Sequence, residues 1–219
     1  MGPSILILIP ALLLAGYAQF KVRSTYGRYE RVRTADGISA GSAAERILAA
    51  EGISDVRIER AKRRLSDHYD PRARVLRLSN PGSVSVAAVG VAAHEAGHAI
   101  QHARGYRPLA LRTSIVPVAT LGSQLALPLL ILGILFRFEP LISVGILAFS
   151  AAVLFTLITL PVEFNASRRA VAALRSGALV NTEELGAVRE VLFAAALTYV
   201  AAAAVAALQL LLLLTARRR

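Results

Sequence analysis

The chain contains no cysteine. This absence excludes a disulfide scaffold, a cysteine nucleophile and a thiolate-bound metal. Any metal ion that the protein binds must therefore be held by histidine, aspartate or glutamate side chains. Aromatic residues are also few, at 6% of the chain, and they are not interleaved with the basic residues.

Acidic residues are outnumbered by basic ones, which gives a formal net charge of +11. Nucleic-acid binding is one interpretation of such a charge. However, the sequence shows no nucleic-acid-binding motif, and no stacking aromatics accompany its basic residues. The cytoplasmic loops of membrane proteins also collect lysine and arginine, and this second interpretation fits the sequence better. We therefore expect no nucleic-acid partner.

Charge is missing from four long stretches, although 18% of the chain is charged. These apolar runs are residues 3–20, 114–136, 141–162 and 191–215. A run of about 20 apolar residues is long enough to cross a bilayer as a helix. The sequence therefore predicts a mainly α integral membrane protein with about four transmembrane helices, which has the lipid bilayer as a partner.

The expected organisation follows from the polar residues between these runs. It comprises an N-terminal membrane anchor at 1–20, a polar module at 21–113, a transmembrane hairpin at 114–162, a polar segment at 163–190, and a C-terminal transmembrane helix with a basic tail at 191–219. Several basic residues directly follow the anchor, and positive charge favours the cytoplasmic side of a membrane. Both polar segments are thus expected in the cytoplasm, while the side on which Arg217–Arg219 lies stays open.

Patterns within residues 21–113 predict a small α+β module. Apolar residues at helical spacing predict a helix over 42–51, and a stretch rich in alanine and valine predicts another over 85–104. Alternating apolar and polar residues predict strands at 56–59 and 74–78. A turn is expected at Tyr69–Pro71.

His94, Glu95 and His98 form the pattern His-Glu-x-x-His in the second of these helices. Residues four apart lie on one face of a helix, so both imidazoles can reach one metal ion, and zinc suits imidazole ligands. Glu95 is offset from this pair and is suited to act as the general base towards a water molecule. The alternative interpretation is that these three residues simply form a solvent-exposed polar face of the helix. However, residues 84–93 carry no charge, and buried histidines in such a helix need a partner.

A catalytic zinc site needs a third protein ligand. His102 continues the histidine stripe, but three ligands from successive turns of one straight helix cannot close on one ion. We therefore expect His102 to be a surface residue whose hydrogen bonds are satisfied, or a residue that contacts the ligands without binding the metal. Glu163 is the better candidate. A charged carboxylate directly after a long apolar run is uncommon, and it usually has a binding partner or a functional role. Its alternative role is to favour the dipole of a helix that begins there.

Four stretches together resemble the bacterial membrane-bound neutral zinc metallopeptidase family, the YugP-like proteins. They are Asp67–Arg72, Val75–Leu78, Val91–Ile100 and Leu160–Arg169. The resemblance covers nearly the whole chain and implies an endopeptidase of membrane or unfolded proteins with a zincin-like (gluzincin) module. Together with the apolar runs and the distribution of basic residues, it leads us to expect a multi-pass protein of the bacterial inner membrane whose active site faces the cytoplasm. The family is in turn similar to the heat-shock and CAAX-prenyl membrane metalloproteases, which supports Glu163 as a ligand.

Those related proteases carry an aspartate where this chain has Ser167, so an orienting carboxylate is missing. Asn165 is expected to take part of its role. Arg168 is considered either as a stabiliser of the oxyanion or as a positively charged membrane anchor. Leu76 lies in the strand at 74–78, which is either a sheet edge that binds an extended substrate or an ordinary interior strand.

We therefore predict a zinc-dependent endopeptidase that hydrolyses peptide bonds of membrane or misfolded proteins. Its catalytic base is Glu95, and its zinc ligands are His94, His98 and Glu163. An intramembrane protease with an aspartate ligand is disfavoured, because the apolar runs after residue 113 contain no aspartate. A non-catalytic membrane scaffold with a structural metal site is the remaining alternative. The sequence does not identify the substrate or the oligomeric state.

Overall fold

The computed structural model describes residue 6 and residues 8–63 and 66–217. The chain forms two compact units. The first, called the helical unit, consists of Met1–Ala18, Arg107–Pro161 and Leu197–Arg219. The second, called the mixed unit, consists of Gln19–Tyr106 and Val162–Ala196.

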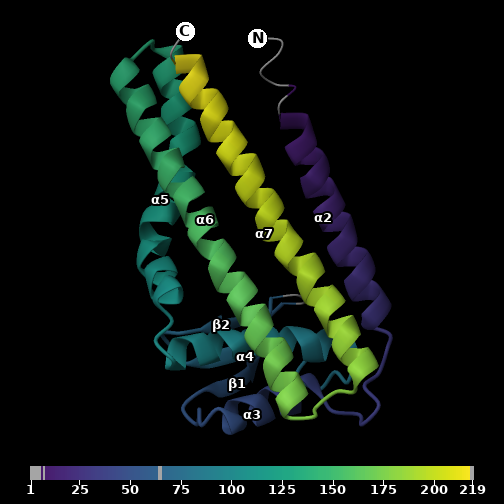
Figure 1. The fold of residues 1–219 in the computed structure, drawn as a ribbon. Helices are drawn as coiled ribbons and strands as arrows, with labels where there is room; N and C mark the ends of the chain where they lie inside the picture. The colour runs from purple at the N-terminus through teal and green to yellow at the C-terminus, as the bar shows by residue number, and fades with distance from the viewer. Residues whose placement is uncertain (1–5, 7, 64–65, 218–219) are drawn as a thin grey trace. The chain divides into compact units, whose positions relative to one another are not determined.

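The helical unit is made of long apolar helices (Figure 1). They belong to α2 (Leu8–Tyr29), α5 (Arg107–Leu135), α6 (Glu139–Ser176) and α7 (Thr182–Arg217). In the described part of the chain, α5, α6 and α7 are long and apolar enough to cross a membrane. Large apolar side chains such as Leu127, Ile134 and Leu147 are exposed on α5 and α6, which suits surfaces that contact lipid.

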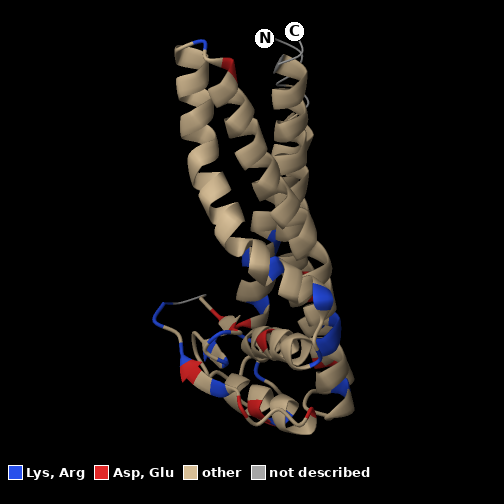
Figure 2. Ribbon diagram, turned by 90° about the vertical axis from the view of Figure 1, so that its left-hand side faces the viewer, with Lys and Arg blue, Asp and Glu red and all other residues tan. Residues whose placement is uncertain are grey.

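Charged side chains are almost absent from the apolar stretches of these helices (Figure 2). The structure therefore agrees with a mostly helical protein that has several membrane-spanning segments. The expected first span at 3–20 begins in residues outside the described ones, and α2 is described from Leu8. A fourth transmembrane helix stays a prediction.

Within the helical unit, α5 packs closely against the first part of α6. The approach is possible because glycine occupies the contacts. A Cβ atom on Gly122 would lie 2.6 Å from the carbonyl oxygen of Ala148, and one on Gly133 would lie 2.7 Å from the side chain of Ile142. In lipid, no hydrophobic effect drives apolar helices together, and small residues instead allow them to associate through close packing.

The mixed unit contains a three-stranded sheet with the order β1-β3-β2. The strands are β1 (Arg57–Arg60), β2 (His68–Asp70) and β3 (Val75–Leu78). β3 pairs in parallel with β1 and antiparallel with β2, where Tyr69 lies opposite Leu76. The central strand is therefore the one that the sequence places at 74–78.

This strand order corrects two expectations. The segment at Tyr69–Pro71 is not simply a turn, because Tyr69 and Asp70 belong to β2 and the turn begins only at Pro71. The strand at 74–78 is an interior strand, because β3 lies between β1 and β2. The prediction that it is a substrate-binding edge is therefore wrong. Leu76 is fully buried, at 0% exposure, and it cannot contact a substrate.

Two helices of the mixed unit begin at serine caps. α3 (Ala40–Ala50) starts after Ser39, whose Oγ accepts a hydrogen bond from the amide of Ser42. α4 (Val86–Ala103) starts after Ser85, whose Oγ accepts from the amide of Ala88. Each cap satisfies an amide that has no partner inside its helix. The two helices pack together over an alanine-rich core that β3, α6 and α7 also join.

Gly97 lies where α4 meets α6. A Cβ atom on Gly97 would be 2.5 Å from the carbonyl oxygen of Ala166, a distance that real side chains do not adopt. Glycine thus lets the two backbones touch at the centre of the His-Glu-x-x-His motif. This close contact brings the side chain of Glu163, one turn before Ala166, within reach of α4.

Candidate metal centre

Three side chains that the sequence analysis selects as ligands lie together in the mixed unit. His94 and His98 project from successive turns of α4, and Glu163 projects from α6. His94 Nε2 is 3.2 Å from Glu163 Oε2, and His98 Nε2 is 3.7 Å from Glu163 Oε1. The three ligand atoms lie within 4.8 Å of one another. No other group of three potential ligands occurs among the described residues.

These distances fit a zinc site. Ligand atoms at about 2.0–2.1 Å from a tetrahedral zinc are about 3.3 Å from each other. The donors are two imidazoles and one carboxylate, which is a set that zinc accepts in catalytic sites with an open fourth position. The two imidazole rings are close neighbours, with centroids 4.8 Å apart and planes at 84° to each other.

The burial of the group also favours a cation. Glu163 is 2% exposed and His98 is 8% exposed. Burial by itself opposes protonation of His98, but the hydrogen bond that His98 donates to Glu163 and the charges of Glu95 and Glu163 outweigh burial and raise the pKa of His98. The carboxylates therefore make this buried place favourable for positive charge.

A buried amide fixes the orientation of His98. Its Nδ1 is 3.0 Å from Gln101 Oε1. Gln101 is completely buried, and its Nε2 donates to the carbonyl oxygen of Val162 and to Asn165 Oδ1. Because Gln101 Oε1 can only accept, His98 carries its proton on Nδ1. With the proton of the neutral ring on Nδ1, Nε2 on the side of Glu163 is the nitrogen available to bind a metal.

Ser167 performs the same task for His94. Its Oγ lies 3.1 Å from His94 Nδ1. Its hydroxyl gives the ring a neutral partner at the position where the sequence lacks the carboxylate that the resemblance implies. Sequence reasoning missed the roles of both Gln101 and Ser167. The available signal was a polar side chain three or four residues from each predicted ligand.

Asn165 does not contact a ligand histidine directly. Its Oδ1 accepts hydrogen bonds from Gln101 Nε2 at 2.9 Å and from Arg169 Nε at 2.8 Å. Asn165 therefore acts on His98 only through Gln101. Arg168 is exposed and lines a separate groove on α6 and α7, so the structure offers no contact that supports its role at an oxyanion.

Glu95 faces β2. Its Oε2 accepts a hydrogen bond of 2.9 Å from the backbone amide of Tyr69, and the residue is 9% exposed. Its charge is close enough to contribute to the raised pKa of His98. The carboxylate is therefore held beside the three potential ligands without being one of them.

His102 is also not part of the metal group. Its Nδ1 lies 2.8 Å from the hydroxyl of Tyr69. Burial, together with the nearby charge of Asp70, raises the pKa of Tyr69, so this hydroxyl keeps its proton. Tyr69 thus contacts Glu95 through its backbone and His102 through its side chain.

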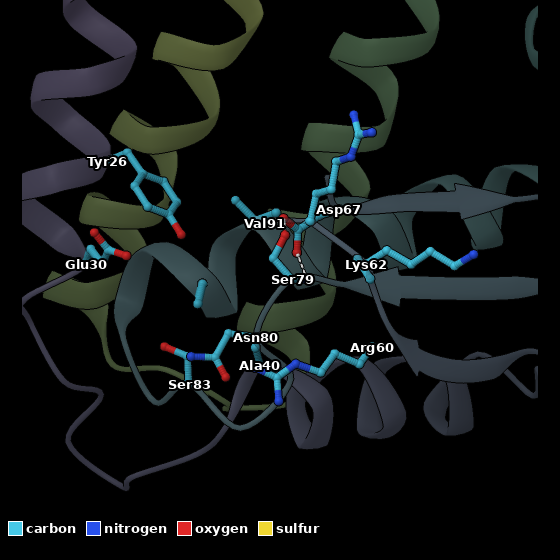
Figure 3. Close-up of a pocket in the computed structure, with 13 residues that line it drawn as sticks. Tyr26, Glu30, Ala40, Arg60, Lys62, Asp67, Ser79, Asn80, Ser83 and Val91 are labelled. Carbon is cyan, nitrogen blue, oxygen red and sulfur yellow. Dashed lines mark hydrogen bonds between the residues drawn. The ribbon is translucent and has the colours of Figure 1, made fainter. Parts of the chain in front are cut away.

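A polar cavity of about 360 Å³ lies beside the first half of α4 (Figure 3). It is lined by residues from the end of α2, the start of α3, the end of β1, the segments that follow β1 and β3, and α4. Asp67 stands in its wall and accepts hydrogen bonds from the amide and the hydroxyl of Ser79. Val91, one helical turn before Glu95, also lines it. None of the three potential ligands does.

The chain is similar to known proteins along nearly its whole length. The family described as "Putative neutral zinc metallopeptidase" matches residues 4–218. The chain is similar to the "Putative membrane protease YugP" of Bacillus subtilis (strain 168), with 48% identity over 201 residues. The matched region covers 90% of this chain and 89% of that protein. No solved structure matches the chain significantly.

Proposed function

Because the chain belongs to the neutral zinc metallopeptidase family, we propose that it is a membrane-embedded zinc endopeptidase that hydrolyses peptide bonds of membrane or misfolded proteins. The observation that carries this proposal is the meeting of His94, His98 and Glu163, with Glu95 held beside them. A structural metal site has no use for such a base. The similarity to a protein named as a membrane protease supports the same activity.

In this mechanism, Nε2 of each histidine and the carboxylate of Glu163 would hold the metal. A zinc ion bound there supplies Lewis acidity, which polarises a peptide carbonyl and makes a water molecule more acidic. Glu95 accepts the proton of the attacking water and transfers it to the nitrogen of the leaving amine. Its hydrogen bond from Tyr69 keeps the carboxylate near this position between turnovers.

We assign substrate binding to the outer edge of β2. This strand pairs with β3 on one side only, and the amide of Tyr69 points away from β3 towards Glu95. An extended peptide that adds to this edge would run past the catalytic base. In the other direction it would reach Asp67 and the polar cavity beside α4, which offers room for a substrate side chain.

We place the site on the cytoplasmic side of a bacterial inner membrane. The basic residues that follow the first apolar run support this orientation. The mixed unit contains both the motif helix and Glu163. The polar segments 21–113 and 163–190 must therefore lie on the same side of the membrane. The alternative of a scaffold with a structural metal predicts the same metal binding but no peptide hydrolysis.

The test compares purified wild-type protein with Glu95→Gln, using a labelled unfolded protein such as casein as substrate. Glu95→Gln should lower the cleavage rate by about 10²- to 10⁴-fold, because the general base is lost, while zinc content stays at one ion per chain. Glu45→Gln, on the exposed face of α3, is the matched control and should cleave normally. Metal-bound wild type that cleaves no protein or peptide would favour the scaffold, and full activity of Glu95→Gln would overturn the mechanism.

A further inference from the structure

A second concave site lies in the mixed unit, between the last part of α6 and the first part of α7, on either side of the turn that joins these helices. Its volume is about 420 Å³. The walls are mainly apolar, with Phe164, Leu192 and Phe193 among the residues that form them. Phe164 is 40% exposed and Phe193 is 62% exposed. We call this site the arginine groove, because three arginines also line it.

These arginines are Arg168, Arg175 and Arg189. All three are exposed. Within the described residues, none of them forms an ion pair or a side-chain hydrogen bond. No aspartate or glutamate lines the groove. The groove therefore presents three uncompensated positive charges beside an apolar surface, which is complementary to an amphiphile with a negative head.

The position of the groove along the chain indicates which amphiphile this is. The uncharged run of α6 ends at residue 162, and the groove begins at Phe164. The uncharged run of α7 begins at residue 191, and the groove ends at Ala196. The groove thus lies where both helices change from apolar to charged sequence, which is the depth of lipid headgroups. Basic pockets between membrane helices at this depth bind anionic lipids.

We propose that the arginine groove binds one anionic phospholipid. Arg168, Arg175 and Arg189 contact its phosphate, and the first part of an acyl chain lies on the apolar wall at Phe193 and Leu192. This site requires membrane insertion of α6 and α7, but it does not depend on peptidase activity. A bound lipid would contact the turn of α6 that carries the metal centre, because Ser167 lines the groove and also contacts His94.

The directions of successive side chains on α6 explain how this helix contributes to both the metal centre and the arginine groove. Glu163 and Ser167 are four residues apart and face His94. Phe164 and Arg168 each follow one of them and line the groove. Consecutive residues of a helix point about 100° apart, so the metal centre and the groove occupy neighbouring faces of the same turn.

The test uses the full chain purified from vesicles of phosphatidylcholine with or without phosphatidylglycerol, and counts retained lipids by native mass spectrometry. Wild type should retain one phosphatidylglycerol per chain and no phosphatidylcholine. The triple variant Arg168→Gln/Arg175→Gln/Arg189→Gln should bind phosphatidylglycerol about 100-fold more weakly. The matched control Arg46→Gln/Arg57→Gln/Arg72→Gln removes the same charge from exposed positions outside the groove and should behave as wild type.

Equal lipid retention by the two triple variants would overturn the proposal, as would equal retention of phosphatidylcholine and phosphatidylglycerol by wild type. Displacement of the lipid by soluble glycerol phosphate at low concentration would also overturn it, because the apolar wall would then contribute nothing. Zinc content and thermal unfolding of each variant show whether the fold is intact. Since none of these measurements involves cleavage, failure here leaves the peptidase proposal unaffected, and the reverse also holds.

Discussion

Gly97 and Ala166 are in backbone contact across two helices, and this contact determines whether a third ligand reaches the histidines. A Cβ atom at Gly97 would lie 2.5 Å from the carbonyl oxygen of Ala166. Because the obstacle is backbone, it cannot rotate away. Any larger residue must separate α4 from α6, and Glu163 moves with α6.

Gly97→Ala should therefore destabilise the protein and weaken zinc binding. Overpacking of this kind costs about 1–3 kcal/mol of unfolding free energy, to be measured as a lower temperature of unfolding in detergent. Gly186→Ala is the matched control, since nothing lies within 4 Å of its Cβ position in α7. That change should be neutral or stabilise by up to about 1 kcal/mol. Equal effects of the two changes would contradict the packing argument.

Glu163→Ala should remove the bound metal, whereas His102→Ala should keep it. Glu163 lies with both ligand histidines, but His102 is hydrogen-bonded to Tyr69. Zinc per chain, measured by mass spectrometry of purified protein, separates the two roles. Zinc retained after the first change and lost after the second would reverse our ligand assignment.

Gln101→Leu should weaken zinc binding by about 10- to 100-fold, which is typical for loss of a group that orients a ligand. Leucine is similar in size but cannot accept the proton of His98 Nδ1, and it leaves Asn165 and the carbonyl of Val162 without the amide donor. Competition with a zinc-binding dye gives the affinity. Gln124→Leu, at an exposed position in α5, should leave the affinity unchanged.

Ser167→Ala should have a similar but smaller effect, because His94 is less buried and water can replace the lost hydroxyl. We expect about a tenfold loss of zinc affinity. Ser176→Ala, nine residues further along the same helix and exposed, is its control. Unchanged affinity of Ser167→Ala would show that the contact of 3.1 Å with His94 does not orient the ring.

Tyr69→Phe should lower stability without changing zinc content. The change removes the hydroxyl that contacts His102 but keeps the backbone amide that donates to Glu95. Loss of one such hydrogen bond costs about 1 kcal/mol, which thermal unfolding can detect. A loss of zinc in this variant would indicate that His102 takes part in metal binding.

Much of the candidate site could be predicted from local patterns. The spacing of His94 and His98 defines one helical face, and Glu163 stands out because it follows a long uncharged run. The proximity of Glu163 to the two histidines depends on the packing of α6 against α4, which Gly97 makes possible. The sequence pattern contains no sign that residue 97 faces another helix.

The misses have physical reasons as well. β2 has only three residues, and its sequence His-Tyr-Asp has no apolar alternation, so it resembles a turn. The order of strands is a long-range property, and thus the central place of β3 could not be read from its own residues. Gln101 is polar and follows the motif, but its burial depends on α6, which lies some 60 residues further along the chain.

The order of the ligands along the chain bears on biosynthesis. Two of the three potential ligands lie before α5, and the third lies after the apolar part of α6. A nascent chain therefore exposes an incomplete metal centre until the ribosome has made both membrane helices of the hairpin. In the mechanism that we propose, hydrolysis would thus depend on completed synthesis of α6, and a fragment that ends before residue 163 would carry the motif without its third potential ligand.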